Sequence, residues 1–134
     1  MGLAERRAAK EFEDRMFPAL KERVDKAAGF EVIMDVQWQT LAKQEYAHLY
    51  GECFPKIYFT PLIDALKSIT KDNLGKEALK KGLKRVVVKN VSGNYYGSGF
   101  TFDDGVLTLD HDFANADSVE ERRDAIQKLL ENAL

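Results

Sequence analysis

The sequence has a single cysteine, Cys53, and no long apolar run. One thiol cannot form an intramolecular disulfide, which excludes the small disulfide-stapled scaffolds of secreted proteins. No stretch approaches the roughly 18 consecutive apolar residues of a membrane-spanning helix. Residues 2–15 carry charges where a signal peptide needs an unbroken apolar core. We therefore expect a cytoplasmic protein without a membrane segment.

An excess of charge of one sign is also absent. The chain has 20 lysine and arginine residues against 22 acids, a net charge of -2. No whole-molecule field therefore draws it to nucleic acid or to an anionic membrane. Of its 134 residues, 45% are hydrophobic and 31% charged, a composition typical of a folded domain. Because repeats, linkers and low-complexity stretches are lacking, residues 1–134 are predicted to form one domain.

The spacing of apolar residues predicts a helix over residues 3–28. Gly29 is placed to end it, and Pro18 inside it predicts a kink or a division into two helices. Residues 30–38 then alternate between the two sides of the chain, which is the period of a strand buried on one face. Trp38 ends this alternation on the apolar side, so we expect it to be buried against helices.

The middle of the chain predicts three short helices, running from the N-cap Thr40 to about Tyr50, from Thr60-Pro61 onward, and near Lys76 to Lys81. A threonine hydroxyl accepts hydrogen bonds from the free N–H groups that begin a helix, and proline is tolerated in the first turn. Residues 51–59, between the first two helices, are interpreted as a connection or a short extended piece.

The C-terminal half predicts strands over residues 84–91, 97–102 and 106–110, followed by a helix whose capping box is Ser118 with Glu121. Turn residues separate the strands, which favours an antiparallel meander. The predicted fold class is therefore α+β. It has a small, mainly antiparallel sheet of about four strands (30–38, 84–91, 97–102 and 106–110) covered by helices, in the order α-β-α-α-α-β-β-β-α.

Acidic residues and a histidine gather around the last strand, at Asp103, Asp110, His111 and Asp112. Carboxylates and imidazole bind divalent metals and serve in acid–base chemistry, so a metal-assisted hydrolase built on these four residues is the alternative function. In a continuing strand, however, Asp110 and Asp112 would point to one side and His111 to the other. Aspartate also favours turns by bonding its own backbone, and this structural interpretation is preferred.

No other pattern indicates catalysis or a cofactor. His48 and Cys53 lack the spacing of a zinc site. The order of strands before a C-terminal helix is similar to the core of zinc metallopeptidases. That family's helix carries His-Glu-x-x-His, whereas residues 122–127 lack this motif, which argues against peptidase activity. No cofactor is predicted.

Charge is unevenly distributed along the chain. The segment from Lys76 to Lys89 is basic apart from Glu77, and the segment from Asp103 to Glu121 is acidic. A basic patch beside aromatic rings can bind single-stranded nucleic acid. Lysine-rich surfaces also serve solubility, and the neighbouring acids would repel phosphates, so nucleic acid is not the predicted partner.

The candidate binding residues are Tyr95 and Tyr96 together with Lys84, Arg85 and Lys89. Adjacent tyrosines in a strand point to opposite faces, so at most one can join the core. An exposed tyrosine is a frequent interface anchor because it offers a large contact area and a polar tip. The sequence thus predicts a small cytoplasmic protein-interaction or binding module without catalytic activity. Its expected partner is another protein, and assembly into a homo-oligomer is kept as an alternative.

Overall fold

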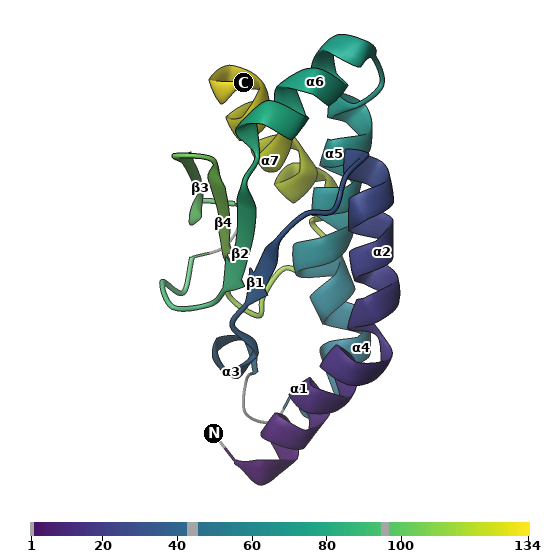
Figure 1. The fold of residues 1–134 in the computed structure, drawn as a ribbon. Coiled ribbons are helices and arrows are strands. Elements are labelled where there is room, and N and C mark those ends of the chain that lie inside the picture. The colour runs from purple at the N-terminus through teal and green to yellow at the C-terminus, as the bar shows by residue number, and fades with distance from the viewer. Residues whose placement is uncertain (1, 43–45, 95–96) are drawn as a thin grey trace.

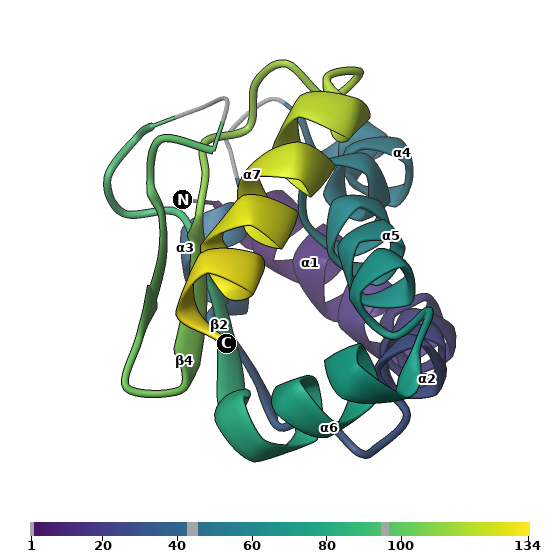
Figure 2. The same cartoon turned by 90° about the horizontal axis from the view of Figure 1, so that it is seen from above.

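Two layers make up the structure, a four-stranded sheet and a layer of helices packed on one of its faces (Figures 1 and 2). The computed structural model describes residues 2–42, 46–94 and 97–134. Its elements in chain order are α1 (Leu3–Arg15), α2 (Phe17–Ala28), β1 (Met34–Val36), α3 (Trp38–Leu41), a 3₁₀ turn (Ala47–Leu49), α4 (Tyr50–Phe54), a π-helical turn (Pro55–Phe59), α5 (Thr60–Ile69), α6 (Asn73–Gly82), β2 (Arg85–Lys89), β3 (Phe100–Asp103), β4 (Val106–Asp110) and α7 (Val119–Ala133). Within the described residues, no helix combines the length and apolarity needed to cross a membrane.

The first predicted helix is divided in two, as Pro18 indicated. The division falls at Met16, and Pro18 lies in the first turn of α2, where its missing N–H costs no helical hydrogen bond. Gly29 ends α2 in the left-handed region, with φ of 86°. A glycine adopts this conformation without the steric penalty that a Cβ would bring.

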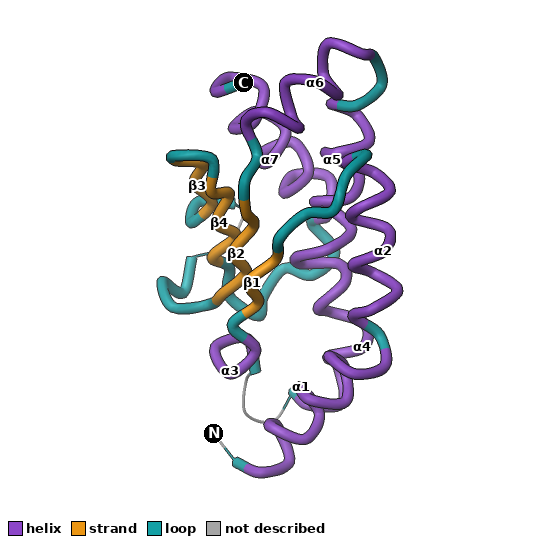
Figure 3. The backbone as a smooth tube through the Cα atoms, in the orientation of Figure 1, coloured by secondary structure: helices purple, strands orange, loops and turns teal. Residues whose placement is uncertain are grey.

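The sheet is mixed and mostly parallel, so the expectation of a mainly antiparallel meander was wrong. Its order is β1-β2-β4-β3, with β1 and β4 both parallel to β2 and only β3 antiparallel to β4 (Figure 3). Burial explains why β4 lies inside. Leu107 and Leu109 of β4 have no exposed surface. In β3, Thr101 and Asp103 are exposed, so this strand can lie at the edge of the sheet.

A turn separates the last two strands, as predicted, and its two central residues are Asp104 and Gly105. Both residues have positive φ, 54° and 81°, which is the geometry of a two-residue hairpin turn. It joins β3 to β4 with Asp103 opposite Val106. The predicted strand 97–102 begins only at Phe100, because the Phe100 N–H donates to the Gly97 carbonyl in a turn.

Strand 30–38 was predicted too long, since only Met34–Val36 pair with β2. Trp38 begins α3 instead of ending the strand. Thr40 lies within this short helix and does not cap a helix to Tyr50. Its hydroxyl donates to the Gln37 carbonyl at 2.7 Å and accepts from the Asn90 N–H at 3.0 Å. That contact helps to end β2 at Lys89, short of the predicted residue 91.

Residues 51–59 were interpreted as a connection or a short extended piece but are helical. With α5, they form a helical run from Tyr50 to Ile69 that is interrupted only by the π-helical turn. In that turn the Thr60 N–H donates to the Pro55 carbonyl, so Thr60 is inside the helix and is not its N-cap. Buried side chains line much of this run, including Phe54, Ile57, Tyr58, Phe59, Leu62 and Ile63, whereas Glu52 and Lys56 form an ion pair at the surface. Pro55 lies inside the run, and because a proline within a helical pattern normally ends or kinks a helix, the sequence did not predict a continuous one.

The last two helices begin close to the predicted positions. The Asp72 carboxylate accepts a hydrogen bond from the Gly75 N–H at 2.8 Å and caps α6, which starts at Asn73. Ser118 precedes α7, but its side chain makes no capping hydrogen bond, so the predicted capping box is not formed.

Aromatic rings fill the core where α1, α3 and α4 meet. Phe54 is fully buried and contacts the rings of Phe12, Trp38, Tyr50, Tyr58 and Phe113. Trp38 packs against helices as expected, although it is partly exposed and lies outside the strand.

Candidate functional site

Polar side chains gather where β2 and β4 end, and they hold the loop after β2. The Asp110 carboxylate accepts hydrogen bonds from the N–H groups of Val91 at 3.0 Å and Ser92 at 3.2 Å. The Asn90 side-chain amide donates to the Asp112 carboxylate at 3.1 Å. These acids thus bind the protein's own backbone and side chains, which is the structural role that aspartate often has at strand ends.

The four residues of the hydrolase alternative do not converge. Asp103 is exposed and pairs with Val106 beside the hairpin turn, at the opposite end of β4 from Asp110. His111 is fully buried. Among residues 2–42, 46–94 and 97–134, no group of three or more histidine, cysteine or acidic side chains could hold a metal ion. The structure therefore does not assemble the ligand set that this alternative requires.

His111 is enclosed by the core next to this cluster. Its Nδ1 lies 2.5 Å from the Asp112 carbonyl, and the Tyr58 hydroxyl donates to the His111 carbonyl at 2.6 Å. The rings of Tyr58 and Phe100 flank the imidazole. Burial lowers the pKa of His111 from its ordinary 6.5 and raises that of Tyr58. A neutral imidazole that donates from Nδ1 fits this environment.

The His111 environment predicts a loss of stability on acidification. As the pH falls through 6.5, the unfolded chain takes up a proton on His111 that the folded chain does not. The free energy of unfolding should then fall by up to about 1.4 kcal/mol per pH unit, until the pH reaches the lower pKa of the folded state. Urea unfolding from pH 7.5 to 5 should show this slope in the wild type and in the exposed-site control His48→Gln. His111→Gln should lose it, and an unchanged slope in that variant would contradict the assignment.

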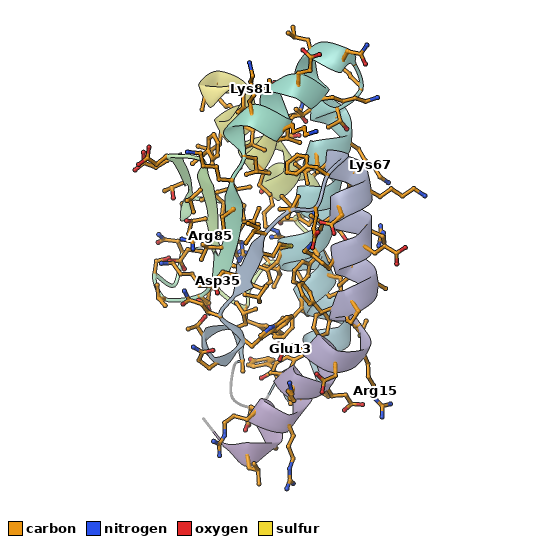
Figure 4. All side chains as sticks on the ribbon, viewed as in Figure 1. Glu13, Arg15, Asp35, Lys67, Lys81 and Arg85 are labelled. Atoms are coloured by element: carbon orange, nitrogen blue, oxygen red, sulfur yellow. The ribbon has the colours of Figure 1, made fainter. Side chains whose placement is uncertain are left out.

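The candidate basic residues lie on β2 and just before it. The Lys84 N–H donates to the Gly105 carbonyl at 2.8 Å, which places Lys84 at the hairpin turn. Arg85 and Lys89 lie on the face of the sheet away from the long helices, where Asp35 and Arg85 are visible (Figure 4). Asp35 and Asp103 share this face, so its charge is mixed. Tyr95 and Tyr96 lie outside the described residues.

A groove lies between β3 and α7, next to the free edge of the sheet. Its volume is about 440 Å³, and its lining is mainly apolar: Gly97, Phe100, Phe102, Ala125, Lys128, Leu129, Asn132 and Ala133. Gly97 brings the backbone close to α7, because a Cβ at this position would lie only 2.8 Å from the Ala125 Cβ. Lys128 is the charged side chain among these lining residues.

The backbone of β3 borders this groove with unsatisfied groups. Among the strands of residues 2–42, 46–94 and 97–134, β3 is the last in the sheet order and pairs with β4 alone. In a hairpin with a two-residue turn, the residues that flank the turn are hydrogen-bonded to each other and the next pair is not. Asp103 and Val106 flank the turn, so the N–H and C=O of Phe102 point away from β4 toward the free edge. The edge is therefore open to another strand.

Sequence reasoning could not find this groove, because it depends on which strand lies at the edge. The alternation of Phe100 and Phe102 with Thr101 and Asp103 showed one apolar side of β3, but not what lies beside it. In comparisons with known proteins, no family model, no curated protein and no solved structure matches this chain.

Proposed function

We propose that the chain is a protein-interaction module that binds an extended peptide segment of a partner protein in the groove between β3 and α7. The observation that carries the proposal is an edge strand with free backbone groups beside an apolar groove. Sheet edges of this kind bind peptides by adding them as a further strand.

The peptide contributes backbone hydrogen bonds to Phe102 and places alternate side chains in the groove. In a strand, every second side chain points to the same face. Side chains on the helix side meet Phe102, Ala125 and Leu129, and those on the other side face solvent. β3 has four residues, Phe100–Asp103, so a short segment is enough to pair with it.

Lys128 gives the groove a preference for an acidic residue in the peptide. It is exposed and borders the apolar lining on α7, where a carboxylate of the bound segment can reach its ammonium group. The expected ligand therefore alternates apolar residues and carries one acid. Tyr95 and Tyr96 directly precede Gly97 in the sequence, and their role as anchors stays a prediction.

Amide hydrogen exchange tests the binding mode. Binders would be selected from a library of short peptides, about six residues long, in which alternate positions are apolar and one position is acidic. Addition of a selected peptide should protect the Phe102 amide, which faces the free edge. The Thr101 amide, which faces β4, serves as the internal control and should change little. Binding without protection of Phe102 would exclude strand addition.

A charge-reversal pair tests the place of binding. Lys128→Glu should weaken the selected peptide about tenfold, because repulsion replaces attraction at the groove. Lys80→Glu makes the same change at an exposed position on α6, and it should retain the wild-type affinity. Fluorescence anisotropy measures both. If the two variants lose affinity equally, or if no library peptide binds, the groove is not the peptide site.

A further inference from the structure

A hollow on the opposite side of the molecule from β3 lies between α2 and α5. Its volume is about 380 Å³, and its lining residues are Arg23, Lys26, Ala27, Lys67 and Thr70. The three charged ones are all positive. Figure 4 places Lys67 on the outer side of the helical layer, away from the sheet and from the groove discussed above.

The floor of the hollow is fixed by contacts between the two helices. The Thr70 hydroxyl donates to the Ala27 carbonyl at 2.8 Å, which ties the end of α5 to the end of α2. Val24 and Leu66 are fully buried at the packed faces of these helices. The three cations therefore project from helices that are held together, and their exposed side chains can converge on a ligand in the hollow.

Carboxylates do not form ion pairs with these cations among the residues that the structure describes. Asp25 is engaged by the Lys21 ammonium at 2.7 Å and by the Val32 N–H at 2.9 Å. Within the described residues, no ion pair joins Arg23, Lys26 or Lys67 to an acid. Three like charges around one hollow repel one another, and a bound anion would relieve that repulsion.

Helix dipoles account for only part of this positive charge. Cations are common in the last turn of a helix because each C-terminus carries roughly half a negative charge. The C-termini of α2 and α5 together supply about one negative charge, against the three positive charges of Arg23, Lys26 and Lys67. Among the lining side chains and the two helix ends a positive surplus remains, which an anion of more than one charge can match.

We propose that this hollow binds the phosphate groups of a small phosphorylated molecule. A guanidinium matches phosphate oxygens with two parallel hydrogen bonds, which suits Arg23, and the two lysines act as point charges. The volume is within the range of about 300–1,000 Å³ that is typical of small-molecule clefts. It is also larger than a single phosphate requires, which favours a diphosphate or a phosphorylated compound.

Pyrophosphate is the probe that tests this site. Titration into the isotope-labelled chain should move the amide resonances of Lys26, Lys67 and Thr70 with one saturable curve, and it should raise the melting temperature, because a ligand of the folded state stabilises it. Orthophosphate should bind more weakly. Sodium chloride at matched ionic strength should not reproduce the shifts, and if it does, screening explains them and the proposal is wrong.

Charge-removing variants locate the site. Arg23→Gln and Lys67→Gln should each weaken pyrophosphate about tenfold, since each removes a charge-assisted hydrogen bond. Lys80→Gln, at an exposed position on α6, is the matched control and should bind like the wild type. Equal loss in all three variants, or no saturable response in the wild type, would overturn the proposal. Neither result depends on peptide binding at β3.

Discussion

Arg122→Ala is expected to lower the free energy of unfolding by about 3–5 kcal/mol. Arg122 has no exposed surface. Its guanidinium donates to the carbonyls of Asn115 at 2.7 Å, Ala116 at 2.6 Å and Lys56 at 3.1 Å. The substitution leaves these carbonyls without this donor in the interior, and each hydrogen bond to a charged group contributes about 1.5–3 kcal/mol.

The neighbouring residue supplies the control. Arg123 lies on the surface of α7 and forms an ion pair with Asp124, so Arg123→Ala should change stability by no more than about 0.5 kcal/mol. Urea unfolding followed by circular dichroism measures both variants. A loss below about 1 kcal/mol for Arg122→Ala would mean that water or another donor replaces the guanidinium.

Arg122 shows what the sequence could and could not indicate. Arg122, Ile126 and Leu130 are spaced by four residues, which places them on one helix face, and all three are buried. The spacing was therefore a usable signal that this arginine faces inward. Its partner Lys56 was not predictable, because Lys56 comes near α7 only through the tertiary fold, whereas Asn115 and Ala116 lie just before α7 in the chain.

Local sequence signals predicted most of the helices and strands. They did not predict the order in which the strands lie in the sheet. Gly29, Pro18 and the Asp104-Gly105 turn act through the conformation of a few residues, so sequence alone was sufficient there. The position of β4 depends on burial across the whole sheet. The run Val86–Val88 is buried on both faces, which is typical of a parallel central strand, and this was the available hint against a meander.

The candidate sites, like the strands, were predictable only as far as they depend on residues close together in the sequence. The sequence identified Asp110, His111 and Asp112 as a group, but not that the carboxylates would hold residues 90–92. The β3 groove and the α2–α5 hollow each combine elements that are far apart in the chain. Arg23 and Lys26 show helical spacing, but nothing in the sequence brings Lys67 to them.

Phe54→Ala should cost about 3–5 kcal/mol in the free energy of unfolding, the range for emptying an aromatic site in a packed core. Phe54 is fully buried, with ring centroids 4.6 Å from Tyr50 and 5.1 Å from Phe12. These neighbours lie on α1 and α4, which cannot close the cavity without shifting helices. That loss is a large part of the roughly 5–15 kcal/mol that stabilises a typical domain.

Two control variants, Phe54→Leu and Phe17→Ala, distinguish the cost of the cavity at Phe54 from the cost of losing any aromatic side chain. Phe54→Leu retains most of the volume and should cost less than Phe54→Ala. Phe17 is partly exposed and contacts Trp38 and Phe59, so Phe17→Ala should also cost less, since its site can be reached by water. Urea unfolding followed by Trp38 fluorescence reports on this region, because the Trp38 ring lies 6.4 Å from Phe54. If Phe17→Ala destabilises the chain more than Phe54→Ala, the centre of the aromatic core lies nearer α2 than this packing implies.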